Sequence, residues 1–298
     1  MSQPSIFDSE TALPSEALAK REKTLLGFAA RYERVHAQLR LLLNIGDLGD
    51  WNRKHHHGKL VICDLIAEQY PFVIFSGDVG TGKTAMAECI ANRLVAEARS
   101  EDSILFKLSN RVRGGGMVGE MGTLIAEAFR KVIQSAGKHR RAILVIDEGD
   151  SLGASRAQDH SHHEDKVAVN TVIQGIDDLR QYGGRIVVIL CTNRLSALDP
   201  ALRRRAAIIE AFKRPSDDER RQLFTMDLAG MGLAAAQIAD LVAMTAARGG
   251  KPAWTYSDIR TRLYPAALAK AYPQEPLRFD HLKAVAMSIE ASPVMEDK

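Results

Sequence analysis

The sequence has little cysteine, and the three residues present exclude a disulfide framework. Cys63, Cys89 and Cys191 lie far apart in 298 residues, with no Cys-x-x-Cys pair. This spacing is typical of small buried side chains in a reducing compartment. The N-terminus also lacks the basic segment and the following apolar segment of a signal peptide. These absences predict a cytoplasmic protein.

A strong charge of one sign and a long apolar run are missing as well. The chain has 40 basic and 37 acidic residues, a net charge of +3, which does not favour nucleic acid or an anionic membrane as the main partner. The most apolar long window, residues 229–247, contains Gln237, Asp240 and two glycines. We expect it to form two packed helices and not to span a membrane.

The N-terminal 58 residues predict a helical extension and a linker. Residues 1–13 are polar and are expected to form a loose tail. From residue 15 to residue 45, apolar residues at helical spacing predict a helix, and they are Leu25, Phe28, Tyr32, Val35, Leu39 and Leu42. Because the stripe is short, it favours packing on the chain's own domain over a partner-binding helix. Residues 46–58 contain His55, His56 and His57, for which a solvated linker is favoured over a metal site.

Strand-like and helical runs alternate between residues 59 and 215. The strand-like runs are 72–75, 104–108, 143–146, 186–190 and 207–212, and the helical runs are 60–69, 84–98, 120–135, 166–181 and 200–204. Near-continuous apolar strands separated by helices predict an α/β fold with a five-stranded parallel sheet. Ligands bind such sheets at the carboxyl ends of the strands.

After Pro215 the pattern is all helical, which predicts a helical lid over residues 216–298. Ser216 and Glu219 have capping-box spacing, and Ser257 and Asp280 are candidate N-caps. We therefore divide the chain into an N-terminal extension (1–58), a large α/β subdomain (59–215) and a helical lid (216–298).

The clearest motif is a glycine-rich loop between a predicted strand and a predicted helix. It has the form G-x-x-x-x-G-K-T and consists of Gly77, Asp78, Val79, Gly80, Thr81, Gly82, Lys83 and Thr84. In this context the backbone amides and the helix N-terminus bind phosphate. Lys83 is expected to reach the β- and γ-phosphates, and the Thr84 hydroxyl to bind Mg²⁺. The loop predicts a nucleoside triphosphate site.

Polar residues follow two other strands. Asp147 and Glu148 end an apolar run, so Asp147 is expected to hold Mg²⁺ and Glu148 to activate water as a general base. Asn193 follows the next strand and can hydrogen-bond the water or the γ-phosphate. Thr-Asn alone is a weak signal, because both residues also start turns.

Three arginines, Arg203, Arg204 and Arg205, follow the sequence Leu-Asp-Pro-Ala-Leu. They are compatible with a solvated face, a nucleic-acid patch, or a charge supplied to the γ-phosphate of a neighbouring subunit.

Taken together, these motifs resemble those of AAA+ ATPases, and most closely the pachytene-checkpoint remodellers of HORMA-domain proteins and their bacterial relatives in cyclic-oligonucleotide antiphage defence. The closer likeness rests on residues 163–177, on the short sequence Arg204-Arg205-Ala-Ala-Ile, and on the short helical end. The resemblance covers about residues 60–290. It implies a homo-hexamer with ATP and Mg²⁺ bound between subunits.

The resemblance also implies residue roles. Lys83 and Thr84 match Walker A, Asp147 and Glu148 match Walker B, and Asn193 matches sensor 1. Arg205 matches the arginine finger best and Arg204 second. Met117 and Val118 fall at the first pore loop, where relatives usually have an aromatic residue, and residues 155–165 fall at the second.

Two departures from the family pattern concern the lid and the N-terminus. Asp258 occupies the expected position of a sensor 2 arginine, with Arg260 nearby. Eukaryotic members of the family carry a larger N-terminal substrate-binding domain where this chain has about fifty residues, so substrate recognition is expected to rest on the N-terminal helix, the pore loops or an adaptor.

The leading interpretation is an ATP-driven protein remodeller that pulls on a HORMA-type partner through its pore loops and regulates cyclic-nucleotide signalling, with a cyclic-nucleotide synthase as a further partner. The alternative is a nucleic-acid-directed motor or a clamp-loader-like ATPase, which the balanced charge does not favour. A nucleotide-sensing scaffold with little turnover is a third alternative, and the presence of Glu148 and the arginines argues against it.

Overall fold

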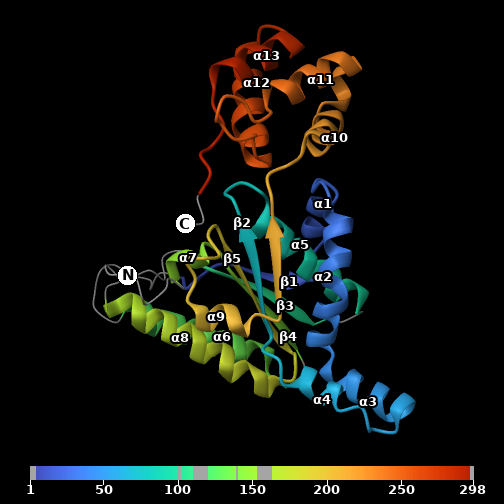
Figure 1. Ribbon diagram of the computed structural model, residues 1–298, viewed down its shortest axis with the longest axis vertical. Coiled ribbons are helices and arrows are strands. Elements are labelled where there is room, and N and C mark those ends of the chain that lie inside the picture. Colours follow the sequence, from blue (N-terminus) through green and yellow to red (C-terminus); the bar gives the residue numbers. More distant parts are fainter. Residues whose placement is uncertain (1–4, 99–101, 110–119, 139, 153–162, 296–298) are drawn as a thin grey trace.

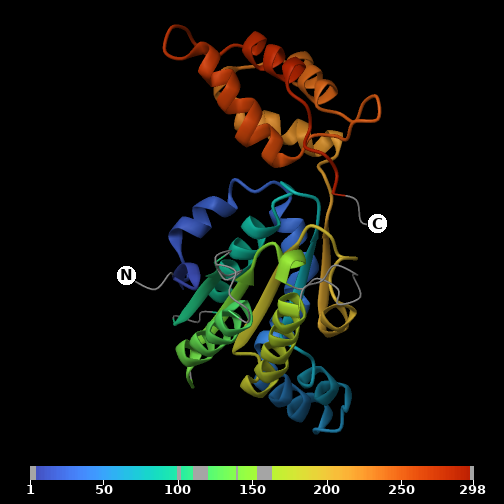
Figure 2. The same ribbon diagram turned by 90° about the vertical axis from the view of Figure 1, so that its left-hand side faces the viewer.

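The structure, a computed structural model, describes residues 5–98, 102–109, 120–138, 140–152 and 163–295. Its larger part is a sheet with helices on both faces, and a smaller helical lid lies beyond one edge of that part (Figure 1). The view turned by 90° shows the lid set off from the sheet and its helices (Figure 2). The predicted boundary at residue 215 falls in the connection that leads into the lid.

Six strands form the sheet, in the order β1-β3-β4-β5-β2-β6. They are β1 (Phe7–Leu13), β2 (Phe72–Gly77), β3 (Ser103–Leu108), β4 (Arg141–Ile146), β5 (Ile186–Thr192) and β6 (Ile208–Phe212). Every neighbouring pair from β3 to β6 is parallel. The predicted α/β fold and its five parallel strands are therefore confirmed, and the sheet has one further strand.

The additional strand β1 corrects the prediction of a loose N-terminal tail. It pairs antiparallel with β3 at the edge of the sheet. Its end residues Phe7 and Leu13 are buried, and the ring centroids of Phe7 and Phe106 lie 4.8 Å apart. The residues between them are mostly polar, and this is why the strand was missed. An antiparallel edge strand with one solvated face needs few apolar side chains.

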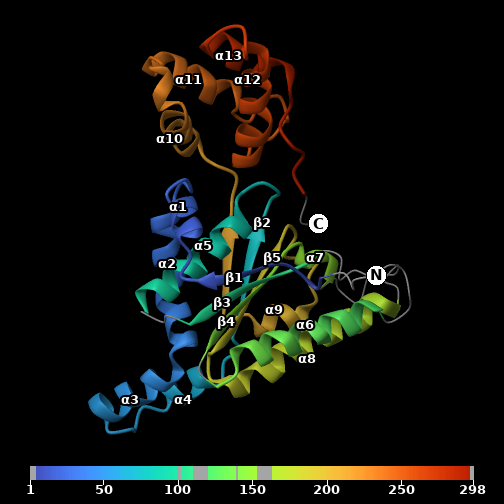
Figure 3. The ribbon, with the colours of Figure 1, turned by 180° about the vertical axis from the view of Figure 1, so that it is seen from behind.

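Helices cover both faces of the sheet (Figures 1 and 3). One layer contains α2 (Phe28–Leu43) and α5 (Lys83–Glu97), with α1 (Glu16–Glu22) beside α5; the other contains α6 (Glu120–Ala136), α8 (His163–Leu179) and α9 (Pro200–Arg205). Along β2, Phe72 and Ile74 join the core of the α6 and α8 layer, whereas Val73 and Phe75 join that of the α2 and α5 layer. Burial on both faces explains why the strand is continuously apolar.

The predicted helix over residues 15–45 is present as two helices. The helical conformation is interrupted between α1 and α2, where Gly27 has a φ of 69°. The apolar stripe of α2 is buried against the sheet and consists of Phe28, Tyr32, Val35, Leu39 and Leu42. This packing confirms that the helix belongs to the chain's own core.

The prediction of a linker over residues 46–58 was wrong, because this segment forms α3 (Ile45–His56), followed by α4 (Ile62–Ala67). The buried Asn52 amide closes the turn between them through two hydrogen bonds of 3.2 Å with the backbone of Leu60. Gly46 and Gly49 have low helix propensity, and they made this segment look like a loop in the sequence. Among the described residues, no three His, Cys, Asp or Glu side chains gather in a way that could hold a metal ion.

The lid has a core of its own. Its elements are α10 (Asp217–Asp227), η3 (Ala229–Met231), α11 (Ala235–Met244), the π-helix η4 (Asp258–Leu263), α12 (Tyr264–Ala271) and α13 (Phe279–Ser288). The capping box of Ser216 and Glu219 is confirmed. Asp280 is not an N-cap, because α13 begins one residue before it. Within the described chain, no helix is both long and apolar enough to cross a membrane.

Candidate nucleotide site

The glycine-rich loop lies between β2 and α5, at the carboxyl end of the parallel sheet (Figure 1). Gly77 has a φ of 147°, and a Cβ atom there would overlap the backbone carbonyl of Phe212 on β6. Only glycine fits this close approach of the two strands, and the approach fixes where the loop leaves the sheet. Lys83 is the first residue of α5. The loop therefore ends at a helix N-terminus, where free backbone amides bind anions.

The Lys83 ammonium group connects this loop with the end of β5. Its Nζ donates hydrogen bonds of 2.9 Å to the carbonyl oxygens of Gly77 and Asp78 and to Oδ1 of Asn193. Lys83 is buried, and this desolvation lowers the pKa of its ammonium group. The structure therefore brings together the loop lysine and Asn193, which the sequence predicted to act at one γ-phosphate.

Thr84 and Asp147 meet at the other side of the loop. The Thr84 hydroxyl donates a hydrogen bond of 2.8 Å to Oδ2 of Asp147, which follows β4. A hydroxyl and a carboxylate are hard oxygen donors, and Mg²⁺ is usually bound by one or two carboxylates together with substrate phosphates. These two side chains fit that ion. A bound Mg²⁺ would offset phosphate charge at this position.

Glu148 has an unusual backbone conformation. Its φ is 50°, in the left-handed region that few residues other than glycine adopt. Its amide donates to Oδ1 of Asp147 at 3.0 Å, so the same carboxylate fixes the turn. Such backbone conformations persist where the surrounding structure enforces them, often at active sites. Glu148 lines the same cleft as Lys83 and Asn193.

Asp150, in the short helix α7 (Gly149–Leu152), is a site residue that the sequence analysis missed. Its Oδ1 accepts hydrogen bonds of 3.2 Å from the Thr192 hydroxyl and from the Asn193 amide. The carboxylate thus holds the end of β5 in the position from which Asn193 reaches Lys83. Its place two residues after Glu148, shortly beyond the end of β4, the strand next to β5, was the available signal.

The nucleotide-sized cleft, about 490 Å³, is lined by three parts of the chain. Besides the loop residues, the lid contributes Tyr256, Ser257, Arg260 and Thr261, and the N-terminal segment contributes Arg21, Thr24 and Leu25. No motif marks the N-terminal residues. Of the two sensor 2 candidates, Arg260 lines the cleft and is paired with Asp227 by two hydrogen bonds of 2.7 Å.

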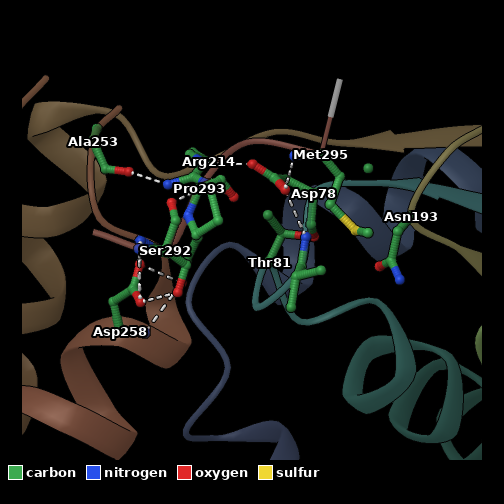
Figure 4. Close-up of polar contacts among 12 residues, drawn as sticks. Asp78, Thr81, Asn193, Arg214, Ala253, Asp258, Ser292, Pro293 and Met295 are labelled. Carbon is green, nitrogen blue, oxygen red and sulfur yellow. Dashed lines mark hydrogen bonds and ion pairs between the residues drawn. The ribbon is translucent and has the colours of Figure 1, made fainter. Parts of the chain in front are cut away.

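The side chains of Asp78 and Asp258 contact other residues and, in the described part of the chain, do not line the cleft. The Asp78 carbonyl accepts from Lys83, but its carboxylate forms an ion pair with Arg214 at 2.6 Å (Figure 4). Asp258 is buried and bonded to Thr255 and Ser292. Burial opposes its ionisation, yet these hydrogen bonds hold the pKa of Asp258 below its ordinary value.

The three arginines at the end of α9 do not line the cleft of their own subunit within the described residues. Arg205 forms a two-pronged ion pair with Asp177 of α8, with N–O distances of 2.6 and 2.9 Å, and its guanidinium lies 5.2 Å from the ring of Tyr70. The ion pair raises the pKa of Arg205. Arg204 is exposed. Met117, Val118 and the predicted second pore loop lie outside the described residues, apart from the backbone start of α8.

Comparisons with known proteins agree with this geometry. Residues 73–214 match the family described as ATPase family associated with various cellular activities (AAA). The chain is 64% identical over 297 residues to CD-NTase-associated protein 6 of Escherichia coli (strain KTE188), and the match covers 100% of both chains.

Two solved structures are similar over almost the whole chain. One is a chain in "Structure of E. coli MS115-1 HORMA:CdnC:Trip13 complex", with a TM-score of 0.88 and 34% identity, covering 99% of this chain and 100% of that one. The other is "Structure of Rhizobiales Trip13", with a TM-score of 0.70 and 31% identity, covering 96% and 99%. With its phosphate loop, its acidic strand end and this full-length likeness, the chain belongs to the AAA ATPases, in the family that includes CD-NTase-associated protein 6 and the Trip13 structures.

Proposed function

We propose that this ATPase is a homo-hexameric protein remodeller that uses ATP and Mg²⁺ to act on a HORMA-domain partner. The observation that carries this proposal is the full-length likeness to a chain of a complex whose description names HORMA and CdnC beside Trip13. The 64% identity to a CD-NTase-associated protein supports a further role beside a cyclic-nucleotide synthase. In this proposal the protein acts in the cytoplasm and regulates antiphage signalling.

The proposed hydrolysis site divides the work among the residues of the cleft. Lys83 and the loop amides bind the phosphates, while Thr84 and Asp147 hold Mg²⁺. Glu148 orients and polarises the attacking water, and Asn193 reports on the γ-phosphate. The 2.9 Å contact between Lys83 and Asn193 and the 2.8 Å contact between Thr84 and Asp147 support this assignment.

A neighbouring subunit is proposed to complete the site with Arg205, or with Arg204. The absence of both from their own subunit's cleft, among the residues described, supports a role at an interface. Mixing Arg205→Ala subunits with Lys83→Ala subunits tests this. Each variant alone should be inactive, whereas co-assembled rings should regain part of the activity, because some interfaces then pair an intact loop with an intact arginine. No recovery in rings shown to contain both variants would assign the finger elsewhere.

The pore loop is proposed to grip the partner through Met117 and Val118. An apolar, adaptable side chain at this position is suited to holding different segments of a polypeptide. Pulling through the pore would change the conformation of the HORMA protein and so switch the synthase.

The deciding experiment measures turnover with three additives: a purified HORMA-domain protein, single-stranded DNA, and duplex DNA. Stimulation by the folded protein alone supports the remodeller. Stimulation by DNA alone supports the alternative of a nucleic-acid-directed or clamp-loader-like ATPase. The control is Glu148→Gln, which should bind ATP and assemble but show no stimulated turnover.

A further inference from the structure

The last described residues of the chain run back from the lid to the phosphate loop. We call residues 289–295 the C-terminal strap; its first residues pack on the lid core through Ile289 and Ala291. The Met295 amide then donates a hydrogen bond of 3.2 Å to Oδ1 of Asp78, in the phosphate loop (Figure 4). The strap therefore joins two parts of the molecule that are more than 200 residues apart in sequence.

Arg214 lies at the centre of this contact, in the connection between β6 and α10. Its Nε donates to Oδ2 of Asp78 at 2.6 Å, and one terminal nitrogen donates to the Ala253 carbonyl at 2.6 Å. The other donates to the carbonyls of Ser292 and Pro293 at 2.8 and 2.9 Å. The Arg214 and Asp78 side chains are only 11% and 10% exposed. A charge-assisted pair with so little solvent is strong, and only the planar fork of arginine can reach all four acceptors.

A second contact joins the lid to the same loop. The Ser257 amide donates a hydrogen bond of 3.2 Å to the Gly80 carbonyl, and a Cβ atom on Gly80 would lie 2.7 Å from Ser257 and from Thr255. Asp258, 1% exposed, accepts hydrogen bonds from Thr255 and from both the amide and the hydroxyl of Ser292. One carboxylate thus ties the turn that touches Gly80 to the strap that touches Asp78.

Asp78 connects these lid contacts with the catalytic lysine. Its carboxylate faces Arg214 and the strap, whereas its backbone carbonyl accepts from the Thr81 hydroxyl at 2.7 Å and from Lys83 at 2.9 Å. A shift of the Asp78 backbone when its carboxylate loses these contacts would therefore move an atom that positions Lys83. Sequence pattern alone gives Asp78 no role beyond being a variable residue of the loop.

We propose that Asp78, Arg214 and the C-terminal strap form a latch that holds the phosphate loop in its binding conformation while the lid is in the orientation seen here. These are positioning residues for the ATPase site. When the lid turns, the latch loosens the loop and lowers nucleotide affinity. The latch rests on the proposed ATP site, and it adds a route by which lid movement controls nucleotide release.

The test uses the full chain and a shortened chain that lacks residues 293–298. The truncation removes the Met295 donor and the Pro293 acceptor but keeps Ser292 and the lid core. Fluorescent ADP should dissociate about tenfold faster from the truncated chain, and amide exchange should rise in the peptide covering residues 77–84. The kcat at saturating ATP should change less than the KM. Arg214→Lys should act in the same direction, because lysine keeps the charge but loses the fork.

The matched control is Glu290→Gln. Glu290 is on the strap but pairs with Lys251 within the lid, at 2.5 Å, with both side chains mostly exposed. This variant should release ADP as the unaltered chain does. Adding Asp78→Asn to the truncation should change the rate of ADP release little further, because both changes disrupt the same latch.

Three results separate the possible failures. If the folded truncated chain keeps the original ADP release rate and loop exchange, the latch is refuted. The latch is also refuted if the effects of Asp78→Asn and the truncation on the ADP release rate multiply fully, because the two changes would then act independently. If the unaltered chain does not bind nucleotide at all, the proposed ATP site fails instead. Thermal melting verifies that each lid is folded, and the truncation still decides the matter if Arg214→Lys does not fold.

Discussion

Replacing Asp150 tests whether the end of β5 is held in place for catalysis. Asp150→Ala removes the acceptor for the Asn193 amide and the Thr192 hydroxyl, each 3.2 Å away. The buried Thr192 hydroxyl keeps a second acceptor, the Arg194 carbonyl at 3.2 Å, so the loss falls mainly on the Asn193 amide. Leaving a buried polar group without its partner costs about 1–3 kcal/mol.

Without the Asp150 acceptor, Asn193 is expected to shift and to weaken its 2.9 Å hydrogen bond with Lys83. Part of the lost free energy is then lost from the active site. If about 1.4–2 kcal/mol is lost from the transition state, kcat falls roughly ten- to thirtyfold. Binding of ADP should change little, because the phosphate loop and the Lys83 contacts with Gly77 and Asp78 remain. The assay is steady-state phosphate release, with ADP affinity measured separately by titration.

The conservative variant Asp150→Asn provides the control. Its amide oxygen can still accept at the same position, so kcat should stay within about threefold of the original, since about 0.6 kcal/mol corresponds to that factor. An unchanged kcat in Asp150→Ala would refute the positioning role. Equal losses in the two variants would indicate that the charge itself is needed.

Three further outcomes follow from the site and the fold. Glu148→Gln should reduce hydrolysis by about 10²–10⁴-fold with ATP binding retained, because the general base is removed while the loop is intact; normal turnover would reject this role. Met117→Ala should leave basal ATPase activity nearly unchanged and abolish remodelling of the HORMA protein, and surviving remodelling would show that Met117 is not the grip. Gly77→Ala should lower the free energy of unfolding by more than about 2 kcal/mol, because its Cβ overlaps the Phe212 carbonyl at a positive φ. The control Gly183→Ala has a positive φ of 57° with nothing within 4 Å, so it should cost only about 1–2 kcal/mol; equal melting temperatures for the two would contradict the overlap.

The parallel strands could be predicted because burial on both faces leaves a continuous apolar run, as in β2 and β5. The same criterion failed for β1, whose burial is confined to Phe7, Leu13 and a partly buried Thr11. It also failed for α3, where Gly46 and Gly49 suggested a loop and only the Asn52 contacts define the turn.

The residues proposed to bind phosphate and metal form a recognisable motif for a different reason. Their spacing along the chain is imposed by one strand, one turn and one helix, so the motif is local. Arg214 and Asp78 are 136 positions apart, and Arg205 and Asp177 are 28 apart. Pairs of this kind depend on how the lid and the helices pack, which no local pattern records. The N-terminal wall of the cleft, with Arg21, was missed for the same reason.

The ion pair between Arg205 and Asp177 has a mechanical consequence. Asp177 is near the end of α8, a helix of 17 residues and therefore about 25 Å long. In the proposed role of Arg205, exchanging Asp177 for a neighbouring γ-phosphate would remove this restraint from one end of α8, and a helix packed along its length would pass the change to its other end, at His163. That far end adjoins the segment where the family resemblance puts the second pore loop. Under the proposed roles of Arg205 and the second pore loop, the presence or absence of a phosphate beside Arg205 would therefore be transmitted to the pore.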